Sequence, residues 1–368
     1  MRPVRNRFIA GATLVASAVV TVAVAVSASA GPASALSGLG LPDYGDLAVD
    51  QKYGHVFISG GPSSNGVVVT DLDGDVEDTI TGQYGATGLA LSADGKKLYV
   101  ALAAGDAISV IDTRSHEEVA RYSTGARTCP THLVRTADVL WFSHGCDGTW
   151  NGGIGRVKFP PPPTATPSPN PTPTASPTPV QPEIALHTQG TVRFQRAPLL
   201  AARDHAAGPL VAGQSNLSLS TVYVYTIDSA GDLSTQASST APGSNLNDIA
   251  VDKYGQTLFT GAGSRNATQA YATADLSGKG SYYTGYYPLA VAQSPDGFHL
   301  ANGVRATGDD VYVYEMGGVV PEQRLDVSTD VVAPRGVTWS PDSERLYVVT
   351  QPPAGGPPEL HVEYDPTA

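Results

Sequence analysis

Residues 89–113 read Leu-Ala-Leu-Ser-Ala-Asp-Gly-Lys-Lys-Leu-Tyr-Val-Ala-Leu-Ala-Ala-Gly-Asp-Ala-Ile-Ser-Val-Ile-Asp-Thr, and this stretch decides the fold. It contains short apolar runs separated by turn residues, among them the Ser-Ala-Asp-Gly turn at 92–95. Runs of this length, rich in β-branched and aromatic residues, are typical of antiparallel strands. A weaker fourth run, Glu118-Val-Ala-Arg-Tyr, follows. The stretch therefore predicts a unit of four short antiparallel strands.

The same unit recurs along the chain. Its inner strands begin at seven positions, namely 47, 89, 133, 200, 249, 291 and 337. The intervals between these positions are 42, 44, 67, 49, 42 and 46 residues. Four strands in every 40–50 residues are typical of a β-propeller blade, and closing the ring removes exposed strand edges. We therefore predict an all-β fold, a seven-bladed β-propeller of four-stranded antiparallel blades.

The long interval has a simple explanation. Residues 160–182 form a Pro/Thr/Ser-rich tract of 23 residues, and 67 − 23 leaves 44. Ile154–Phe159 resembles the third strand of a blade and Ile184–His187 its fourth, so we predict that the tract is a disordered loop inserted within the third blade. We accordingly expect a single propeller domain over residues 36–368. The seventh unit ends after its third strand, and residues 36–44 are a candidate for the missing fourth.

Particular residues of the repeat are similar to those of a known family. Lys97-Leu-Tyr-Val and Ile108-Ser-Val-Ile-Asp-Thr resemble the YVTN-type repeat of bacterial surface-layer and YncE-like propellers, and Arg345-Leu-Tyr-Val-Val and the Ser-Pro-Asp turns at Ser294 and Ser340 support the resemblance. The N-terminus and the Pro/Thr tract look like those of secreted actinobacterial proteins. The resemblance implies a seven-bladed fold outside the cytoplasm, with a binding or scaffolding role and no catalytic motif.

The N-terminus has the pattern of a secretory signal. Three arginines precede an apolar run over residues 8–26, and small residues follow at 28–30 and 33–35. This arrangement predicts a signal peptide over residues 1–30, with an alternative cleavage after 35. The formal net charge of −12 would become −15 on cleavage, because three arginines and no acids are removed. We expect a secreted, monomeric protein at the cell surface or cell wall, with no membrane span after cleavage. An acidic chain without a basic stripe also excludes a nucleic-acid partner.

The two cysteines predict a disulfide. If residues 131–136 and 139–143 form a hairpin, opposed residue numbers sum to 275, and so do those of Cys129 and Cys146. Bridged cysteines are usual in exported proteins. The alternative is a zinc site built from Cys129, His132, His144 and Cys146, but strand alternation places His132 on the other face from Cys129. We therefore expect no metal and no cofactor.

The acidic run Asp71–Asp78 resembles a calcium loop but has its glycine at position four rather than six. We interpret it as the polar hairpin between two strands, with a weak calcium site as the alternative.

Several polar residues stand where inner strands begin and could meet at the central mouth of the ring. They are His132, Asn247, Asp248 and Arg335. They would suit a lactonase-type hydrolase, but residues of these types also serve as ordinary turn and strand-entry residues. Whether the protein is an enzyme stays open, and we favour a protein that is not one.

The loops between second and third strands are longer than a hairpin needs, at 60–66, 144–153, 213–220, 261–269 and 351–359. One of them holds Trp150 beside Asp147 and Asn151. An exposed indole flanked by carboxylate and amide groups suits stacking on a sugar ring or a peptide. We predict a non-enzymatic binding or scaffold module whose long-loop face engages a glycan or protein of the cell envelope. The alternatives are the hydrolase and a purely structural spacer.

Overall fold

The computed structural model describes residues 38–137, 139–146, 148, 150–160, 181–203 and 206–367. The expected signal peptide and residues 161–180 of the Pro/Thr/Ser tract lie outside the described residues. Every regular element within them is a β-strand, and there are 27.

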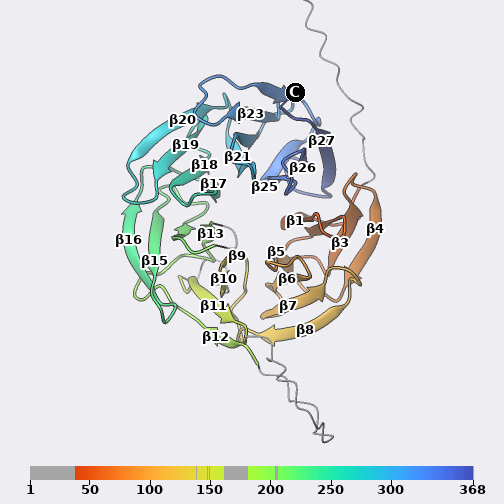
Figure 1. The fold of residues 1–368 in the computed structure, drawn as a ribbon, viewed down its shortest axis with the longest axis vertical. Coiled ribbons are helices and arrows are strands. Elements are labelled where there is room, and N and C mark those ends of the chain that lie inside the picture. The colour runs from red at the N-terminus through yellow and green to blue at the C-terminus, as the bar shows by residue number, and fades with distance from the viewer. Residues whose placement is uncertain are drawn as a thin grey trace, which may run out of the picture. The chain divides into compact units, whose positions relative to one another are not determined.

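The strands form seven antiparallel sheets arranged around a ring, which confirms the predicted seven-bladed propeller (Figure 1). Blade 1 comprises β1 (Asp46–Asp50), β2 (His55–Ser59), β3 (Gly66–Asp71) and β4 (Val76–Thr81). Blade 2 comprises β5 (Ala86–Leu91), β6 (Lys97–Leu102), β7 (Ala107–Asp112) and β8 (Glu118–Ser123). Blade 3 comprises β9 (Leu133–Thr136), β10 (Val139–His144), β11 (Gly153–Lys158) and β12 (Glu183–Ala185). Blades 4 and 5 comprise β13 (Leu199–Ala202), β14 (Leu210–Gly213), β15 (Val222–Ile227), β16 (Leu233–Ser239); and β17 (Leu246–Val251), β18 (Thr257–Ala262), β19 (Ala267–Ala272), β20 (Gly278–Tyr283). Blades 6 and 7 comprise β21 (Pro288–Gln293), β22 (His299–Val304), β23 (Val311–Glu315), β24 (Gln323–Leu325); and β25 (Val331–Trp339), β26 (Arg345–Gln351), β27 (Glu359–Tyr364).

The turns that join first and second strands explain why the repeat is so regular. In the Ser-x-Asp turns the serine hydroxyl donates to the aspartate two residues on, and it accepts the backbone N–H five residues on. Ser92 accepts from Lys97 N, Ser294 from His299 N and Ser340 from Arg345 N, each at 2.9 Å. The local sequence therefore fixes a tight turn at the same point of three blades.

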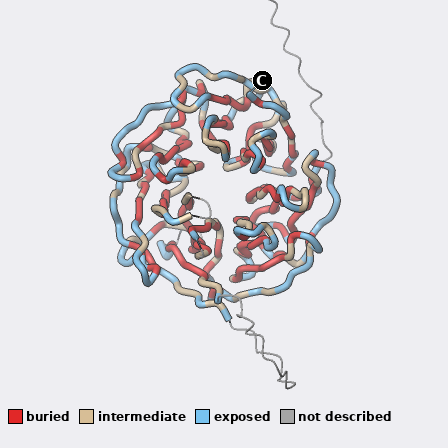
Figure 2. Tube along the Cα trace, in the orientation of Figure 1, coloured by how far each residue is buried: buried red, intermediate tan, exposed pale blue. Residues whose placement is uncertain are grey.

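The core lies between neighbouring blades. One apolar cluster joins β2 and β3 of blade 1 to β5 and β6 of blade 2 through Phe57, Val69, Leu98 and Val100, all fully buried. Burial is concentrated in the inner and middle strands, whereas the outer strands such as β4 and β8 are largely exposed (Figure 2). The inner strands are thereby held rigidly around the axis of the ring.

The third blade keeps the predicted hairpin register. Arg135 pairs with Leu140, as expected, and β11 pairs with β12 across the Pro/Thr/Ser tract. In the sequence, the tract therefore stands between two strands that pair in one sheet.

The seventh blade has three strands among the described residues. Residues 38–44 form no strand, so the expectation that they supply its fourth is wrong for this part of the segment. Instead Leu39, Leu41 and Tyr44 are buried against blades 1 and 7. The segment contains Gly38, Gly40 and Pro42, which disfavour a regular ladder.

Candidate functional site

The polar residues at the centre of the ring gather around Arg335. The inner strand β25 shifts register between Val332 and Val337, which inserts residues 333–336 into the strand. Arg335 lies in this bulge with a φ of +63°, a backbone conformation that a non-glycine residue rarely adopts. Bulges of this kind redirect side chains next to functional sites.

The guanidinium of Arg335 lies between two aspartates from different blades. Its Nη2 donates to the carboxylate of Asp46 at 3.1 and 3.2 Å, and its Nε is 3.8 Å from Oδ1 of Asp248. The two carboxylates are largely buried, so the cation neutralises charges that water solvates only weakly. Arg335 thereby connects blades 1, 5 and 7.

Each aspartate also ties two neighbouring blades through backbone hydrogen bonds. Asp46 accepts from the N–H groups of Leu47 and Leu89, at 3.1 and 3.0 Å. Asp248 accepts from the N–H groups of Ile249 and Val291, both at 2.8 Å. The two carboxylates hold the same place in their blades, and each accepts two backbone N–H groups from two neighbouring blades.

His132 completes the cluster as a neutral base. The Nη1 group of Arg335 donates to its Nδ1 at 2.6 Å, and its backbone N–H donates to the hydroxyl of Ser143 at 3.0 Å. Burial, aided by the charge of Arg335, holds the pKa of His132 well below its usual range. Tyr44 donates its hydroxyl to the carbonyl of Arg335 at 3.0 Å.

Burial raises the pKa of both aspartates. For Asp248 burial is the largest cause, opposed by Arg335 and two backbone N–H groups, and its pKa rises to about 7. The pKa of Asp46 is raised for the same reason. A carboxyl group with a pKa near neutrality, next to a neutral imidazole, is an arrangement that acid–base catalysis also uses.

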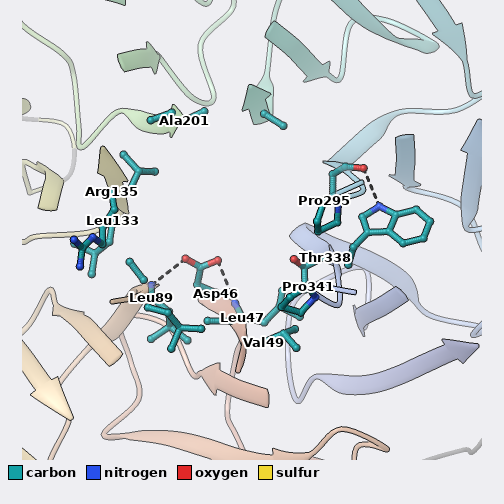
Figure 3. A pocket seen from close by; sticks show the side chains of 18 of the residues that line it. Asp46, Leu47, Val49, Leu89, Leu133, Arg135, Ala201, Pro295, Thr338 and Pro341 are labelled. Atoms are coloured by element: carbon teal, nitrogen blue, oxygen red, sulfur yellow. Dashed lines mark hydrogen bonds between the residues drawn. The ribbon is translucent and has the colours of Figure 1, made fainter. Parts of the chain in front are cut away.

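A cavity of about 880 Å³ runs along the axis from this cluster to the turns between first and second strands. Asp46 projects from the wall of this cavity, with its two backbone hydrogen bonds drawn (Figure 3). Most of the wall consists of small aliphatic side chains of the inner strands, such as Ala48, Val49, Ala90, Val134, Ala201, Ala250 and Ala292. The middle of the cavity is therefore mainly apolar, with the Arg335 cluster at one end and charged residues such as Asp50, Lys52 and Lys253 at the other.

Three of the four residues predicted at the mouth do meet there: His132, Asp248 and Arg335. Asn247 does not, because it lies at a register shift of β17 between Leu246 and Asp248, and its Nδ2 donates to the carbonyl of Pro288 at 3.0 Å. Asp46 and Tyr44 were missed by the sequence reasoning. A signal for Asp46 existed, because it directly precedes Leu47 just as Asp248 directly precedes Ile249, both at the start of a repeat.

The loop that carries Trp150 is a second candidate surface, between β10 and β11. Cys129 and Cys146 form the predicted disulfide at its base, with a Cα–Cα distance of 5.3 Å. The bond rules out the zinc tetrad, because both sulfurs are used. The disulfide indicates an oxidising environment. The side chain of Trp150 is exposed, with 55 % of the residue accessible, and its backbone N–H donates to the carbonyl of Gln195 at 3.2 Å.

The structure describes only one of the two polar residues that we predicted beside this indole. Asn151 directly follows Trp150 and is exposed, whereas Asp147 lies outside the described residues. The loop expected at 261–269 is shorter than predicted and covers residues 263–266, since β18 and β19 extend into it.

The acidic run at 71–78 forms a hairpin turn. Asp71 Oδ1 accepts from the backbone N–H groups of Asp73 and Asp75, at 3.0 and 2.9 Å. This matches the interpretation as a polar hairpin, since the carboxylate serves the turn itself.

Among the described residues, no helix is long and apolar enough to cross a membrane. No protein-family model and no curated protein matches the chain, so the YVTN-type resemblance stays a prediction. Solved structures do match. The β-propeller domain of Myceliophteria thermophila Cps50 (Swd1) has a TM-score of 0.63 at 13 % identity, over 90 % of this chain and 99 % of that one. A chain of the mitotic checkpoint complex has a TM-score of 0.64 at 14 % identity, over 98 % of this chain and all of that one. Likeness at this identity shows the propeller fold.

Proposed function

We propose that this protein is a non-enzymatic binding module that acts outside the cytoplasm and engages a cell-envelope ligand through its long-loop face. We define this face as the one formed by the loops between second and third strands, which emerge on one side of the ring because strand direction alternates within every blade. Propellers commonly serve as protein-interaction scaffolds, and one similar structure is a chain of the mitotic checkpoint complex.

The exposed indole of Trp150 carries this proposal. A tryptophan that is 55 % exposed leaves a large apolar surface in water, which is unfavourable by about 25 cal/mol per Å² unless a ligand covers it. The disulfide at the loop base and the backbone bond to Gln195 restrain the loop before any ligand arrives. A restrained aromatic side chain loses little entropy on binding, which is why such residues dominate interface energetics.

The central cluster supports a module without catalysis. Both carboxylates accept backbone N–H groups, and both face Arg335. These contacts give both carboxylates a structural role in joining blades, so their place at the centre of the ring requires no catalytic function.

The test uses binding to isolated cell-envelope fractions, with glycan and protein fractions assayed separately. Trp150→Ala should weaken binding at least tenfold. The matched control is Phe298→Ala, since Phe298 is 66 % exposed but lies at a turn between first and second strands, on the opposite side of the ring. Equal binding by both variants and the unmodified protein would remove the proposal.

Fluorescence adds a direct readout, because Trp141 and Trp339 are buried and Trp150 is the exposed indole among the three tryptophans of the chain. A bound ligand should protect Trp150 from quenching by acrylamide. Unchanged quenching on saturation would place the ligand elsewhere.

A hydrolase of lactonase type is the second candidate. The convergence of His132, Asp248 and Arg335 and the pKa of Asp248 near 7 favour it. Turnover of a lactone or ester that disappears in Asp248→Asn, with folding retained, would establish it over the binding module.

A further inference from the structure

Two histidines from neighbouring blades face each other on the side of the ring opposite the long-loop face. His55 begins β2 of blade 1, and His116 lies in the turn between β7 and β8 of blade 2. Their ring centroids are 4.6 Å apart with planes at 74°, and Nδ1 of His55 is 3.5 Å from Nε2 of His116. The side chains are only 14 % and 13 % exposed, so both rings are held in place.

The outer nitrogen of each ring faces a carboxylate. Nδ1 of His116 is 2.9 Å from Oδ2 of Asp78, and Nε2 of His55 is 3.6 Å from Oε2 of Glu77. Both acids belong to β4, where they are adjacent in sequence and about half exposed. The two rings are therefore bracketed by two negative charges.

The two carboxylates favour one tautomer of each imidazole ring. A neutral imidazole holds one proton, and the carboxylates favour protons on the outer nitrogens. In the tautomer that the carboxylates favour, both inner nitrogens present lone pairs, 3.5 Å apart. A proton on one inner nitrogen would form an N–H···N hydrogen bond between the rings, whereas a metal ion would be bound by both nitrogens.

A metal ion fits the distance between these two nitrogens, once the rings turn so that both lone pairs point at it. With zinc–nitrogen bonds of about 2.05 Å, a separation of 3.5 Å gives a nitrogen–metal–nitrogen angle of about 117°, close to tetrahedral. Carboxylates on the outer nitrogens are also the usual second layer around histidine ligands, where they orient the ring and raise its basicity. Imidazole nitrogen selects late transition metals such as Zn²⁺, whereas Ca²⁺ and Mg²⁺ prefer oxygen.

We propose that His55 and His116 form a binding site for a divalent late transition-metal ion, with Asp78 and Glu77 orienting the two rings. Among the described residues, no group of three or more ligating side chains is assembled, so water completes the coordination. A site with two protein ligands binds its metal reversibly. Since the ligands come from two blades, the bound ion links blade 1 to blade 2.

The test is a titration of the full-length, disulfide-bonded protein with Zn²⁺ by calorimetry and with Co²⁺ by visible absorption. One ion should bind per chain, with a histidine-ligand spectrum for Co²⁺. His55→Gln and His116→Gln should each weaken binding at least tenfold. Asp78→Asn should weaken it roughly 10- to 100-fold, as for other residues behind a metal ligand.

The matched control is His299→Gln, because His299 faces a carboxylate of Glu322 at 3.4 Å as a single histidine. This variant should bind as the unmodified protein does. A second control, His187→Gln, tests the other close histidine pair, in which His144 and His187 have ring centroids 4.6 Å apart. Absence of one-to-one binding, or binding lost in His187→Gln but kept in His55→Gln, would overturn the proposal. Asp78 is surface-exposed, so its variant keeps the test decisive should a histidine variant fail to fold.

Discussion

Replacing Arg335 by methionine removes the guanidinium that lies between Asp46 and Asp248 while keeping a side chain of similar length. The two carboxylates then stay buried without their cation. Removing one partner of a buried ion pair typically costs about 3–5 kcal/mol, since the remaining charge is uncompensated. A propeller of roughly 300 residues unfolds with an entropy of about 0.6 kcal/mol per degree, so the loss corresponds to about 5–8 °C in Tm.

The assay is calorimetric or circular-dichroism melting at pH 7.5, with chemical denaturation as a second measure. Arg324→Met is the matched control, because Arg324 is 56 % exposed and lies 3.8 Å from the similarly exposed Asp309. An exposed pair contributes less than about 1 kcal/mol, so this variant should melt within about 2 °C of the unmodified protein. A comparably small shift for Arg335→Met would refute the view that the cluster stabilises the ring.

The pH dependence of the Tm difference tests whether the lost charge of Arg335 is what destabilises the variant. The folded pKa of Asp248, about 7, lies above its unfolded value, so the folded state binds the proton more tightly and stability rises as pH falls from 7 towards 4. Removing Arg335 raises the pKa of both aspartates further and releases His132 from a neighbouring positive charge. Both changes let the variant recover on acidification. The difference between variant and unmodified protein should therefore shrink between pH 7.5 and pH 5; a constant difference would point to lost packing instead.

Three further predictions concern the scaffold. Replacing Cys129 and Cys146 by serine opens a loop whose ends are 17 residues apart and should lower the free energy of unfolding by about 3 kcal/mol, measured by chemical denaturation. His144 has a folded pKa of about 4, chiefly through burial, so the folded state binds fewer protons and stability should fall as pH drops from 6.5 to 4; His144→Leu should flatten that slope in melts across this range. Gly155→Ala would place a methyl group 2.3 Å from a buried phenyl ring and should cost about 1–3 kcal/mol, whereas Gly278→Ala, with open space around it, should change Tm little.

The ring itself could be predicted because short apolar strands and polar turns recur along the chain at a nearly constant interval. In three blades a Ser-x-Asp turn such as that at Ser294 fixes where the first strand ends, and apolar alternation indicates which faces are buried. The numerical register that placed Cys129 opposite Cys146 needed only one hairpin, and Arg135 pairs with Leu140 as that register requires. Features set by contacts near in sequence were therefore within reach of sequence reasoning.

The central cluster could be predicted only in part. His132, Asp248 and Arg335 follow from the geometry of a propeller, in which the inner strands converge on the axis. Their partners do not follow, because the bulge at 333–336 redirects Arg335 by a shift that no periodicity indicates. The proposed metal site is harder still: His55 and His116 are 61 residues apart, and they hold different places in their respective blades.

At the interface between blades 1 and 7, residues of the central cluster also help to close the ring. Neighbouring blades elsewhere are joined by the chain, but blades 1 and 7 meet without such a link, and among the described residues no strand is exchanged between them. This interface is closed by side chains instead: Gln51 donates to Asp342 at 2.8 Å, and Tyr347 donates to the carbonyl of Leu72 at 3.0 Å. Arg335 adds its ion pair with Asp46 to these contacts. The charged centre is therefore part of ring closure, because the carboxylate that holds blade 1 to blade 2 also holds blade 1 to blade 7. This structural role of the cluster supports the proposal that a ligand binds elsewhere, at the exposed loop of Trp150.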